Sequence, residues 1–301
     1  MNILITGGLG FIGNHLVRYL LKKDPENKII VIDDLSSGKM SFLKDVRSKF
    51  IFYDIDITNK EGIDRCFRKE GPDIIIHLAA IHFIPECNQN PAKTISVNII
   101  GTHNVVTLAN KYNVKQFIFA SSASVYGATH KKNNEDDLPN PLDIYGCSKL
   151  CGEQIIKNLC QVNWSVLRFF NVIGTNETHE HLLPVIIKQL KNNSGLVLGN
   201  LESKRDYLFI EDLLRGVGEV INNKKAYSQI LNMGTGRGTS VREVVHGFEV
   251  ALKKQIEISQ SANLKRGVDN PKLVASIEKI RKLINWEPKY SFQEALNKIL
   301  L

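Results

Sequence analysis

The sequence of 301 residues has no apolar run long enough to cross a bilayer. Its first residues, MNILITGG, lack the basic segment, apolar stretch and cleavage site of a secretory signal, and are typical of a first β-strand. Cysteine is scarce: there are five, an odd number that argues against a disulfide framework. We therefore expect a cytoplasmic protein without a membrane partner, whose cysteines are buried free thiols.

A charge pattern suited to nucleic acid is also missing. The 39 Lys and Arg residues outnumber the 31 Asp and Glu residues, but they are scattered and form only short clusters. Cys147 and Cys151 lie four residues apart, yet no further Cys or His at zinc spacing accompanies them. We expect neither a nucleic-acid partner nor a metal site. A mild positive field favours anionic small molecules such as nucleoside diphosphates.

The first half of the chain alternates short apolar runs with helical patterns. The runs are rich in Ile, Val, Leu and Phe without clean polar alternation, which is typical of strands buried on both faces. They cover 2–6, 28–33, 49–53, 73–78, 116–120 and 164–170. Helical patterns separate them near 11–23, 59–69, 91–112 and 144–160. This order predicts an α/β fold with a doubly wound, parallel Rossmann sheet.

The pattern changes after about residue 171, where helical patterns near 182–192 and 211–223 are joined by short elements. We expect a Rossmann domain over 1–170 and a smaller α/β lobe over 171–301, from which some segments return to the first domain. The polar stretch 127–143 is expected to be a surface loop.

Glycines at G-x-x-G-x-x-G spacing follow the first predicted strand. Gly7 allows a tight turn, Gly10 lets the backbone approach a pyrophosphate, and Gly13 lets the next helix pack against the strand. The helix N-terminus supplies N–H donors for phosphates. Asp33, at the end of the second strand, can bond ribose hydroxyls and repel a 2′-phosphate. The predicted cofactor is therefore NAD rather than NADP.

Tyr145 and Lys149 are four residues apart in a predicted helix, which places them on one face. An ammonium one turn away, together with a positive nicotinamide ring, is expected to lower the pKa of Tyr145 so that it can act as an acid and a base. Ser122, at the end of the fifth predicted strand, can bridge a substrate hydroxyl and the tyrosine oxygen.

Several motifs occur in order along the chain: TGGLGFIG, HLAA, NIIGTHN from Asn98, SSASVYG, YGCSK and RFFNVIG. Over nearly its whole length the sequence resembles the extended short-chain dehydrogenase/reductase family, and within it the UDP-glucose 4-epimerase-like members of the nucleotide-sugar epimerase/dehydratase group. The resemblance implies a catalytic triad of Ser122, Tyr145 and Lys149. It also implies a homodimer formed through the helices 91–112 and 144–160.

The resemblance, with the pattern above, gives two sets of site residues. The cofactor set is Gly7, Gly10, Phe11, Ile12, Gly13, Asp33, Asp56, Ile57, Leu78, Ala79, Ala80, Asn98, Tyr145 and Lys149. The substrate set is Ser122, Ser124, Tyr145, Asn171, Arg205 and Arg266. Two arginines can clamp a diphosphate by charge-assisted bonds. Related UDP-hexose epimerases can carry an aromatic residue where Leu273 stands, so Leu273 is expected to leave room for an N-acetyl group.

The residues after Ser122 separate the reactions of the family. Its 4,6-dehydratases carry Asp-Glu directly after the catalytic Ser or Thr, and its UDP-glucuronate decarboxylases carry Glu two residues after it. Ala123 and Ser124 occupy these places. The resemblance thus implies an NAD-dependent nucleotide-sugar 4-epimerase that forms a transient 4-keto sugar, on a UDP-hexose or UDP-N-acetylhexosamine. Two alternatives stay open: a GDP- or CDP-sugar reductase or 4-dehydrogenase, and a non-catalytic dinucleotide-binding relative.

Overall fold

A computed structural model describes residues 1–192, 195–261, 264 and 270–301. Seven parallel strands form its main sheet in the order β11-β6-β5-β4-β1-β2-β3. Their bounds are β1 Asn2–Thr6, β2 Lys28–Asp33, β3 Phe50–Asp54, β4 Ile74–His77, β5 Gln116–Ser122, β6 Asn163–Phe169 and β11 Gln229–Met233. The central strands are almost wholly buried, as their apolar sequences require. The predicted parallel Rossmann sheet is confirmed.

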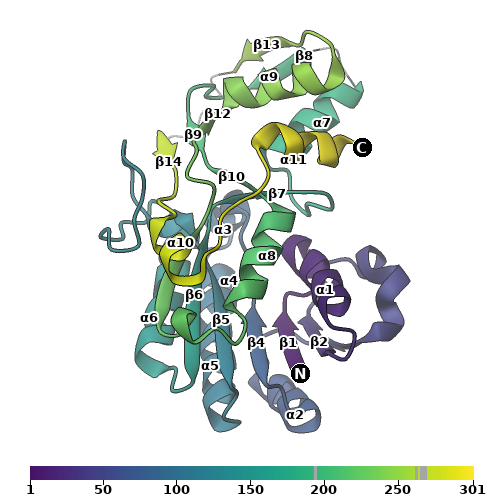
Figure 1. Ribbon diagram of the computed structural model, residues 1–301, viewed down its shortest axis with the longest axis vertical. Helices are drawn as coiled ribbons and strands as arrows, with labels where there is room; N and C mark the ends of the chain where they lie inside the picture. The colour runs from purple at the N-terminus through teal and green to yellow at the C-terminus, as the bar shows by residue number, and fades with distance from the viewer. Residues whose placement is uncertain (193–194, 262–263, 265–269) are drawn as a thin grey trace.

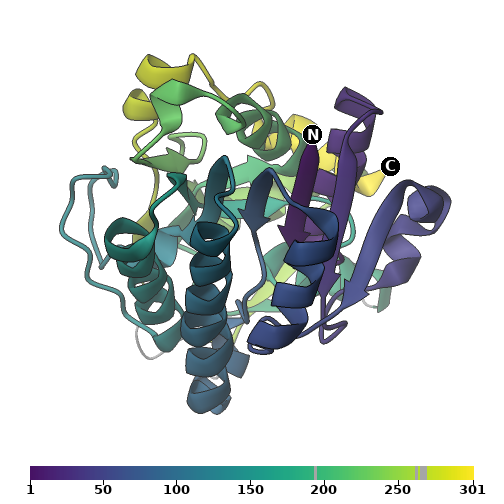
Figure 2. The ribbon, with the colours of Figure 1, turned by 90° about the horizontal axis from the view of Figure 1, so that it is seen from below.

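Helices cover both faces of this sheet (Figure 2). Helices α2, α5 and α6 lie along one face, and α1 and α8 lie along the other. The bounds are α1 Phe11–Lys23, α2 Lys60–Glu70, α5 Thr102–Lys111, α6 Ile144–Leu159 and α8 Ile210–Val220. Because every strand is parallel, all strands end at the same edge of the sheet. That edge faces the second lobe (Figure 1).

The second lobe consists of short strands and helices beyond the carboxyl edge of the sheet (Figure 1). Its strand sets are β7 Asn171–Ile173 with β10 Tyr207–Phe209, β8 Gly195–Leu198 with β13 Glu257–Gln260, and β9 Lys204–Arg205 with β12 Thr239–Ser240 and β14 Lys272–Leu273. Its helices include α7 Leu182–Asn192, α9 Val241–Leu252 and α11 Phe292–Leu300, while α10 Glu278–Ile284 packs near β11. The chain therefore leaves the main sheet after β6 and returns to it at β11.

The helix predicted over 91–112 is divided into three segments. They are α4 Pro91–Ile95, the π-helical turn η2 Ser96–Gly101, and α5. A π turn holds extra backbone per turn, and apolar spacing does not reveal it. Gly101 closes this turn against Ile57, where an added Cβ would lie 2.5 Å from the Ile57 Cδ1 atom. The local widening thus lets the helix path pass close to the residues after β3.

Exposure differs from the expectation at the cysteines. Cys66 and Cys87 are buried free thiols, but Cys147 and Cys151 are exposed on one face of α6. The four-residue spacing correctly places the latter pair on one face, but it does not say which way that face points. Among the described residues, no helix has the length and apolar content that a membrane span requires.

Candidate active site

A cleft of about 1350 Å³ opens at the carboxyl ends of the main strands and is lined by residues of both lobes. Parallel α/β sheets bind ligands at this edge. The volume exceeds the roughly 300–1,000 Å³ of an ordinary small-molecule pocket. The predicted residues that line it are Gly7, Gly10, Phe11, Ile12, Gly13, Asp33, Asp56, Ile57, Leu78, Ala79, Ala80, Ser122, Ser124, Tyr145, Lys149, Asn171 and Arg205.

The glycine turn after β1 has the close contacts that its sequence predicts. Gly7 has a φ of +69°, and an added Cβ there would lie 2.7 Å from the Ala79 nitrogen. A Cβ on Gly13 would lie 2.2 Å from the Gly7 carbonyl oxygen, so only hydrogen fits. At Gly10, the residue before α1, no described side chain caps the helix. The first N–H groups of α1 are thus available to an anionic ligand.

Asp33 ends β2 at the wall of the cleft and is only 7% exposed. Its carboxylate accepts hydrogen bonds from the backbone N–H groups of Leu9 and Leu35, each at 2.9 Å. Burial raises the pKa of Asp33, and these two hydrogen bonds oppose the rise. The bond to Leu9 connects β2 to the glycine turn, so Asp33 orders this turn as well as bordering the cleft.

Asn98 lies behind the cleft wall rather than on it. Its side chain accepts from Ile81 N at 2.8 Å and donates to Ile81 O at 2.9 Å and to Ser148 Oγ at 2.9 Å. It is 2% exposed, because the π turn directs it into the space between α6 and the loop after β4. In the described structure Asn98 therefore supports the wall at Ile81, and its contact with the cofactor stays a prediction.

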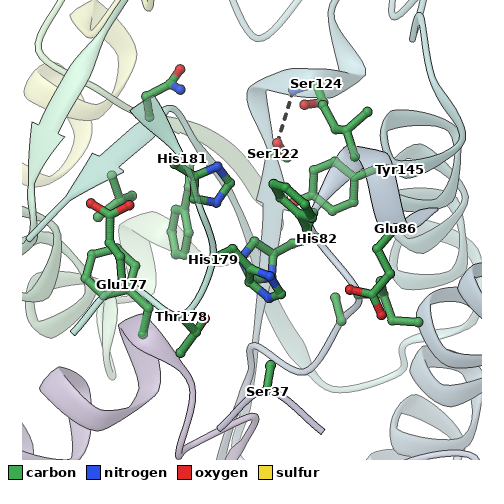
Figure 3. A pocket seen from close by; sticks show the side chains of 18 of the residues that line it. Ser37, His82, Glu86, Ser122, Ser124, Tyr145, Glu177, Thr178, His179 and His181 are labelled. Atoms are coloured by element: carbon green, nitrogen blue, oxygen red, sulfur yellow. Dashed lines mark hydrogen bonds between the residues drawn. The ribbon is translucent and has the colours of Figure 1, made fainter. Parts of the chain in front are cut away.

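The predicted triad meets where β5 ends and α6 begins. The Asp143 side chain caps α6 by accepting from Gly146 N at 2.7 Å, which starts the helix just before Tyr145. The Lys149 ammonium donates to Ala120 O at 2.8 Å and lies 5.9 Å from the centroid of the Tyr145 ring. Ser122 and Tyr145 both face the cleft (Figure 3).

Burial is the main influence of the protein itself on the pKa of Tyr145. Burial raises it, and a hydrogen bond to Ser122 opposes this rise without cancelling it. Burial also lowers the pKa of Lys149 to about 8, so Lys149 is still mainly an ammonium at pH 7. The expectation that Lys149 and a positive nicotinamide ring together lower the pKa of Tyr145 stays a prediction. Sequence spacing places the two groups on one face but cannot measure this burial.

Ser124 and the residues of the second lobe complete the predicted substrate side. The backbone N–H of Ser124 donates to Ser122 Oγ at 3.1 Å, which orients that hydroxyl (Figure 3). Arg205 lies in β9 beside Leu273 of β14, and both border the cleft. The Arg205 guanidinium donates to Asn270 O at 2.7 Å. Arg266 lies outside the described residues.

Three histidines, which the sequence reasoning did not single out, stand in the middle of the cleft. The ring centroids of His82 and His179 are 4.6 Å apart, those of His82 and His181 are 5.8 Å apart, and Phe83 stacks on His179 at 5.1 Å. Figure 3 shows His82 and His179 side by side, with Tyr145 on one side and Glu177 on the other. This cluster joins the loop after β4 to the segment after β7.

Burial disfavours the charged forms of His82, His179 and the neighbouring Glu177. It lowers the pKa of His82 to about 3 and also lowers that of His179, while it raises the pKa of Glu177 to about 8. Within the described ranges, no group of three or more His, Cys, Asp or Glu is arranged to hold a metal ion. The paired sequence signals HF after HLAA and HEH after NVIG could have drawn attention to the cluster.

The model of the NAD dependent epimerase/dehydratase family matches residues 3–234. The chain belongs to this family. Its glycine turn, cleft and triad therefore occur in the structural setting shared by an NAD-dependent family, and the suspected kinship with epimerases is confirmed.

Relatives of known name are similar to this chain over nearly its full length. The UDP-glucose 4-epimerase of Lactobacillus helveticus is 32% identical over 96% of this chain and 93% of its own length. The structure of the Thermotoga maritima UDP-glucose 4-epimerase with UDP-glucose has a TM-score of 0.91 and 30% identity, covering 100% of this chain and 97% of that one. The Thermus thermophilus UDP-glucose 4-epimerase complex with NAD has a TM-score of 0.87 and 28% identity, covering 100% and 98%.

Proposed function

We propose that this protein is an NAD-dependent UDP-sugar 4-epimerase. The observation that carries the proposal is the placement of Ser122 and Tyr145 in one cleft with the glycine turn, in a chain similar to UDP-glucose 4-epimerases. Ala123 and Ser124 stand where family dehydratases and decarboxylases carry their acids. The side chains at these two positions therefore offer no carboxylate for elimination or decarboxylation.

The chain fits NAD at the glycine turn. The crowded Gly7 and Gly13 leave the backbone of Gly10 open to a pyrophosphate, where an added Cβ meets only the Gly7 oxygen at 3.4 Å. Asp33 stands at the end of β2, where its carboxylate can accept hydrogen bonds from ribose hydroxyls and repel a 2′-phosphate. NAD, when bound, supplies the oxidant for the sugar carbinol.

The triad residues hold the sugar hydroxyl and move its proton. Ser122 orients the hydroxyl toward the Tyr145 oxygen, which takes the proton during oxidation and returns it after the keto-sugar has turned over. Lys149, anchored on Ala120 O, places a positive charge near the phenol and favours its ionised form. Burial opposes that ionisation, so Tyr145 depends on positive charge close to it.

The second lobe contributes the nucleotide side of the proposed site. Arg205 borders the cleft from β9, and we assign it, with Arg266, to the diphosphate of the substrate. Asn171 follows β6 at the same wall. Leu273, smaller than an aromatic side chain, leaves space next to Arg205 that suits an N-acetyl group.

A homodimer is also part of the proposal. On the two helical segments expected to form the interface, 91–112 and 144–160, Val105 and Ile156 are buried in the core, whereas Ile100 and Leu159 are 50% and 48% exposed. Ile95 adds a further side chain that is 42% exposed on the same helical path. Light scattering tests this assignment, and a monomer contradicts it.

We place the protein in the cytoplasm, where the free cysteines would stay reduced.

The deciding experiment is turnover without added cofactor. Purified protein is mixed with UDP-glucose or UDP-N-acetylglucosamine, and the C4 epimer is followed by chromatography. Product formation without added NAD supports a 4-epimerase that retains its cofactor, and the Tyr145→Phe variant should lose about 10²-fold or more in kcat. A need for stoichiometric NADH or NADPH would instead identify a reductase. Dinucleotide binding without any turnover would identify a non-catalytic relative.

A further inference from the structure

A buried ion pair lies directly behind the triad. Arg168 of β6 binds Glu153 of α6 through two parallel hydrogen bonds, Nε to Oε1 at 2.8 Å and Nη2 to Oε2 at 2.7 Å. Their side chains are only 2% and 0% exposed. The Ser121 hydroxyl donates to the same Glu153 Oε1 at 2.6 Å. A carboxylate this deep in the protein needs such partners, because isolated buried charge is strongly unfavourable.

The pair is built into the seam that aligns α6 with β5. Ser121 lies opposite Arg168 in the β5–β6 register, and Ser122 follows it. Lys149 bonds Ala120 O, and Glu153, one turn further along α6, bonds Ser121. Two successive turns of α6 are therefore attached to two successive residues of the strand that ends at Ser122.

Glu153 is also a competing partner for Lys149. Burial lowers the pKa of Lys149, and Cys87 and then the Glu153 carboxylate act in the opposite direction. Lys and Glu four residues apart on a helix are within reach of each other. In a medium of low dielectric constant their attraction is far stronger than in water. Arg168, by occupying both carboxylate oxygens, removes the reason for Lys149 to move toward Glu153.

We propose that Arg168 is a positioning residue, which engages Glu153 and so keeps the Lys149 ammonium on Ala120 O beside Tyr145. This inference rests on the proposed acid–base role of Tyr145. It assigns a function to a buried salt bridge that would otherwise be regarded as purely structural.

The network around Arg168 keeps the guanidinium in place from the other side. Its Nη1 donates to Tyr126 Oη at 2.8 Å and to Glu135 O at 3.2 Å. Tyr126 in turn donates to Asn232 Oδ1 of β11 at 2.8 Å. These bonds fix Arg168 in the orientation that presents two donors to Glu153.

Other titratable groups near Tyr145 come from α3 (Ile84–Gln89) and from the start of α6. Cys87 of α3 and the Asp143 carboxylate both act to raise the pKa of Tyr145, in the same direction as burial. Burial raises the pKa of Cys87 itself, so its thiol is neutral near pH 7. Neither group compensates for a displaced Lys149.

Around Lys149 the facing groups from β4 and the following loop are imidazoles. Burial lowers the pKa of His77 and of His82 to about 3, and the charge of Lys149 contributes in each case. Both are therefore neutral in the working range of pH. Among the groups that act on Lys149, Glu153 is the carboxylate. The experiment therefore tests whether Arg168 neutralises the charge of Glu153.

The test compares Arg168→Met with the double variant Arg168→Met/Glu153→Gln. In the single variant we expect kcat to fall about tenfold or more and the acid limb of the kcat–pH profile to move up by about half a unit or more, with KM changed less than about twofold. Removing the carboxylate in the double variant should return the limb to its wild-type pH and recover most of kcat. A merely structural role would lower thermal stability without these two linked changes.

The matched control is Arg215→Met, which breaks another pair with a buried carboxylate, Arg215 Nη2 to Asp212 Oδ1 at 2.6 Å. This pair lies away from the cleft, so the control should lose stability and keep its acid limb. If Arg168→Met does not fold, Arg168→Gln with and without Glu153→Gln makes the same comparison. An unmoved limb in a folded single variant, or no recovery in the double variant, overturns the inference.

Failure of this inference is distinguishable from failure of the proposed function. If Tyr145→Phe is inactive while the Arg168 variants keep the wild-type profile, only the positioning role is wrong. If Tyr145→Phe converts UDP-sugars at full rate, the acid–base role itself is wrong.

Discussion

Gly13 and Gly7 approach each other so closely that a Cβ on Gly13 would lie 2.2 Å from the Gly7 carbonyl oxygen. A Cβ on Gly10 would lie 3.4 Å from that oxygen, which is an ordinary contact. Two glycines of one motif therefore have different reasons for lacking a side chain. Gly13 is required by packing within the protein, whereas we assign Gly10 to the space that the proposed pyrophosphate needs.

Gly13→Ala should destabilise the protein. Backbone atoms of Gly7 and Gly8 cannot move away without displacing β1 or α1, so we expect a loss of about 1–3 kcal/mol in the free energy of unfolding. Denaturant unfolding monitored by circular dichroism measures it. A variant as stable as the wild type would show that the turn relaxes more easily than its contacts indicate.

Gly10→Ala should behave in the opposite way. We expect unfolding within about 0.5 kcal/mol of the wild type, since the added methyl group meets only ordinary contact. Bound NAD, released by heat and quantified by chromatography, should fall well below one equivalent per chain. Full NAD content in this variant would place the pyrophosphate elsewhere in the cleft.

Asp33→Asn should weaken NAD binding by about tenfold or more, because charge-assisted hydrogen bonds to ribose hydroxyls become neutral ones. The preference for NAD over NADP should also shrink, because the variant no longer repels a 2′-phosphate. The control is Asp54→Asn, which alters the exposed partner of Asp33 on β3, outside the cleft lining. Titration with both dinucleotides measures the ratio; an unchanged ratio contradicts the role of Asp33.

His77 should make the protein less stable in acid. Its buried ring bonds Thr6 Oγ1 at 2.6 Å and Thr102 Oγ1 at 3.0 Å, and burial lowers its pKa to about 3. The unfolded chain, with a histidine pKa near 6.5, binds the proton more readily, so this stability is complete above about pH 6.5 and is lost as pH falls toward 3.

The free energy of unfolding should therefore fall with decreasing pH, with up to about 1.4 kcal/mol per pH unit coming from His77. His77→Gln should reduce that slope between pH 6 and 4, as measured by urea unfolding at several pH values. His130→Gln, at an exposed position, is the control and should retain it. Equal slopes for all three proteins would remove His77 as the source.

Leu273→Tyr should select against N-acetylated sugars. The larger side chain next to Arg205 would occupy the space proposed for the acetamido group. We expect kcat/KM for UDP-N-acetylglucosamine to fall about tenfold or more relative to UDP-glucose, whereas Leu273→Met should leave the ratio nearly unchanged. A wild-type enzyme that converts only the plain hexose would reject the assignment of Leu273.

The sheet and the glycine turn could be predicted from sequence because their causes are local. Apolar runs without alternation indicate strands buried on both faces, Gly7 adopts a positive φ in the turn, and Gly13 contacts the backbone of Gly7 and Gly8 within the same turn. The parallel direction of the strands followed from their alternation with helices, whereas β11, which joins the sheet from beyond residue 171, was not among the predicted strands. The π turn before Thr102 could not be predicted, since apolar spacing continues through it unchanged.

The chemistry of the cleft was less accessible. The spacing of Tyr145 and Lys149 predicted a shared face, but the direction of the Tyr145 pKa depends on how far the folded chain excludes water. Asn98 belongs to a recognisable motif, yet its side chain is used by Ile81 and Ser148. The histidine cluster joins His82 to His179 across nearly a hundred residues of chain, and only tertiary structure brings such positions together.

Strand β11 limits how this protein can be recombined with its relatives. A chain cut after β6 would expose β6 as a bare sheet edge, open to pairing with other molecules. It would also remove Asn232, the acceptor for Tyr126. Exchanging the specificity of this enzyme by grafting thus requires two junctions, one on each side of the transplanted region, with β11 kept from the host.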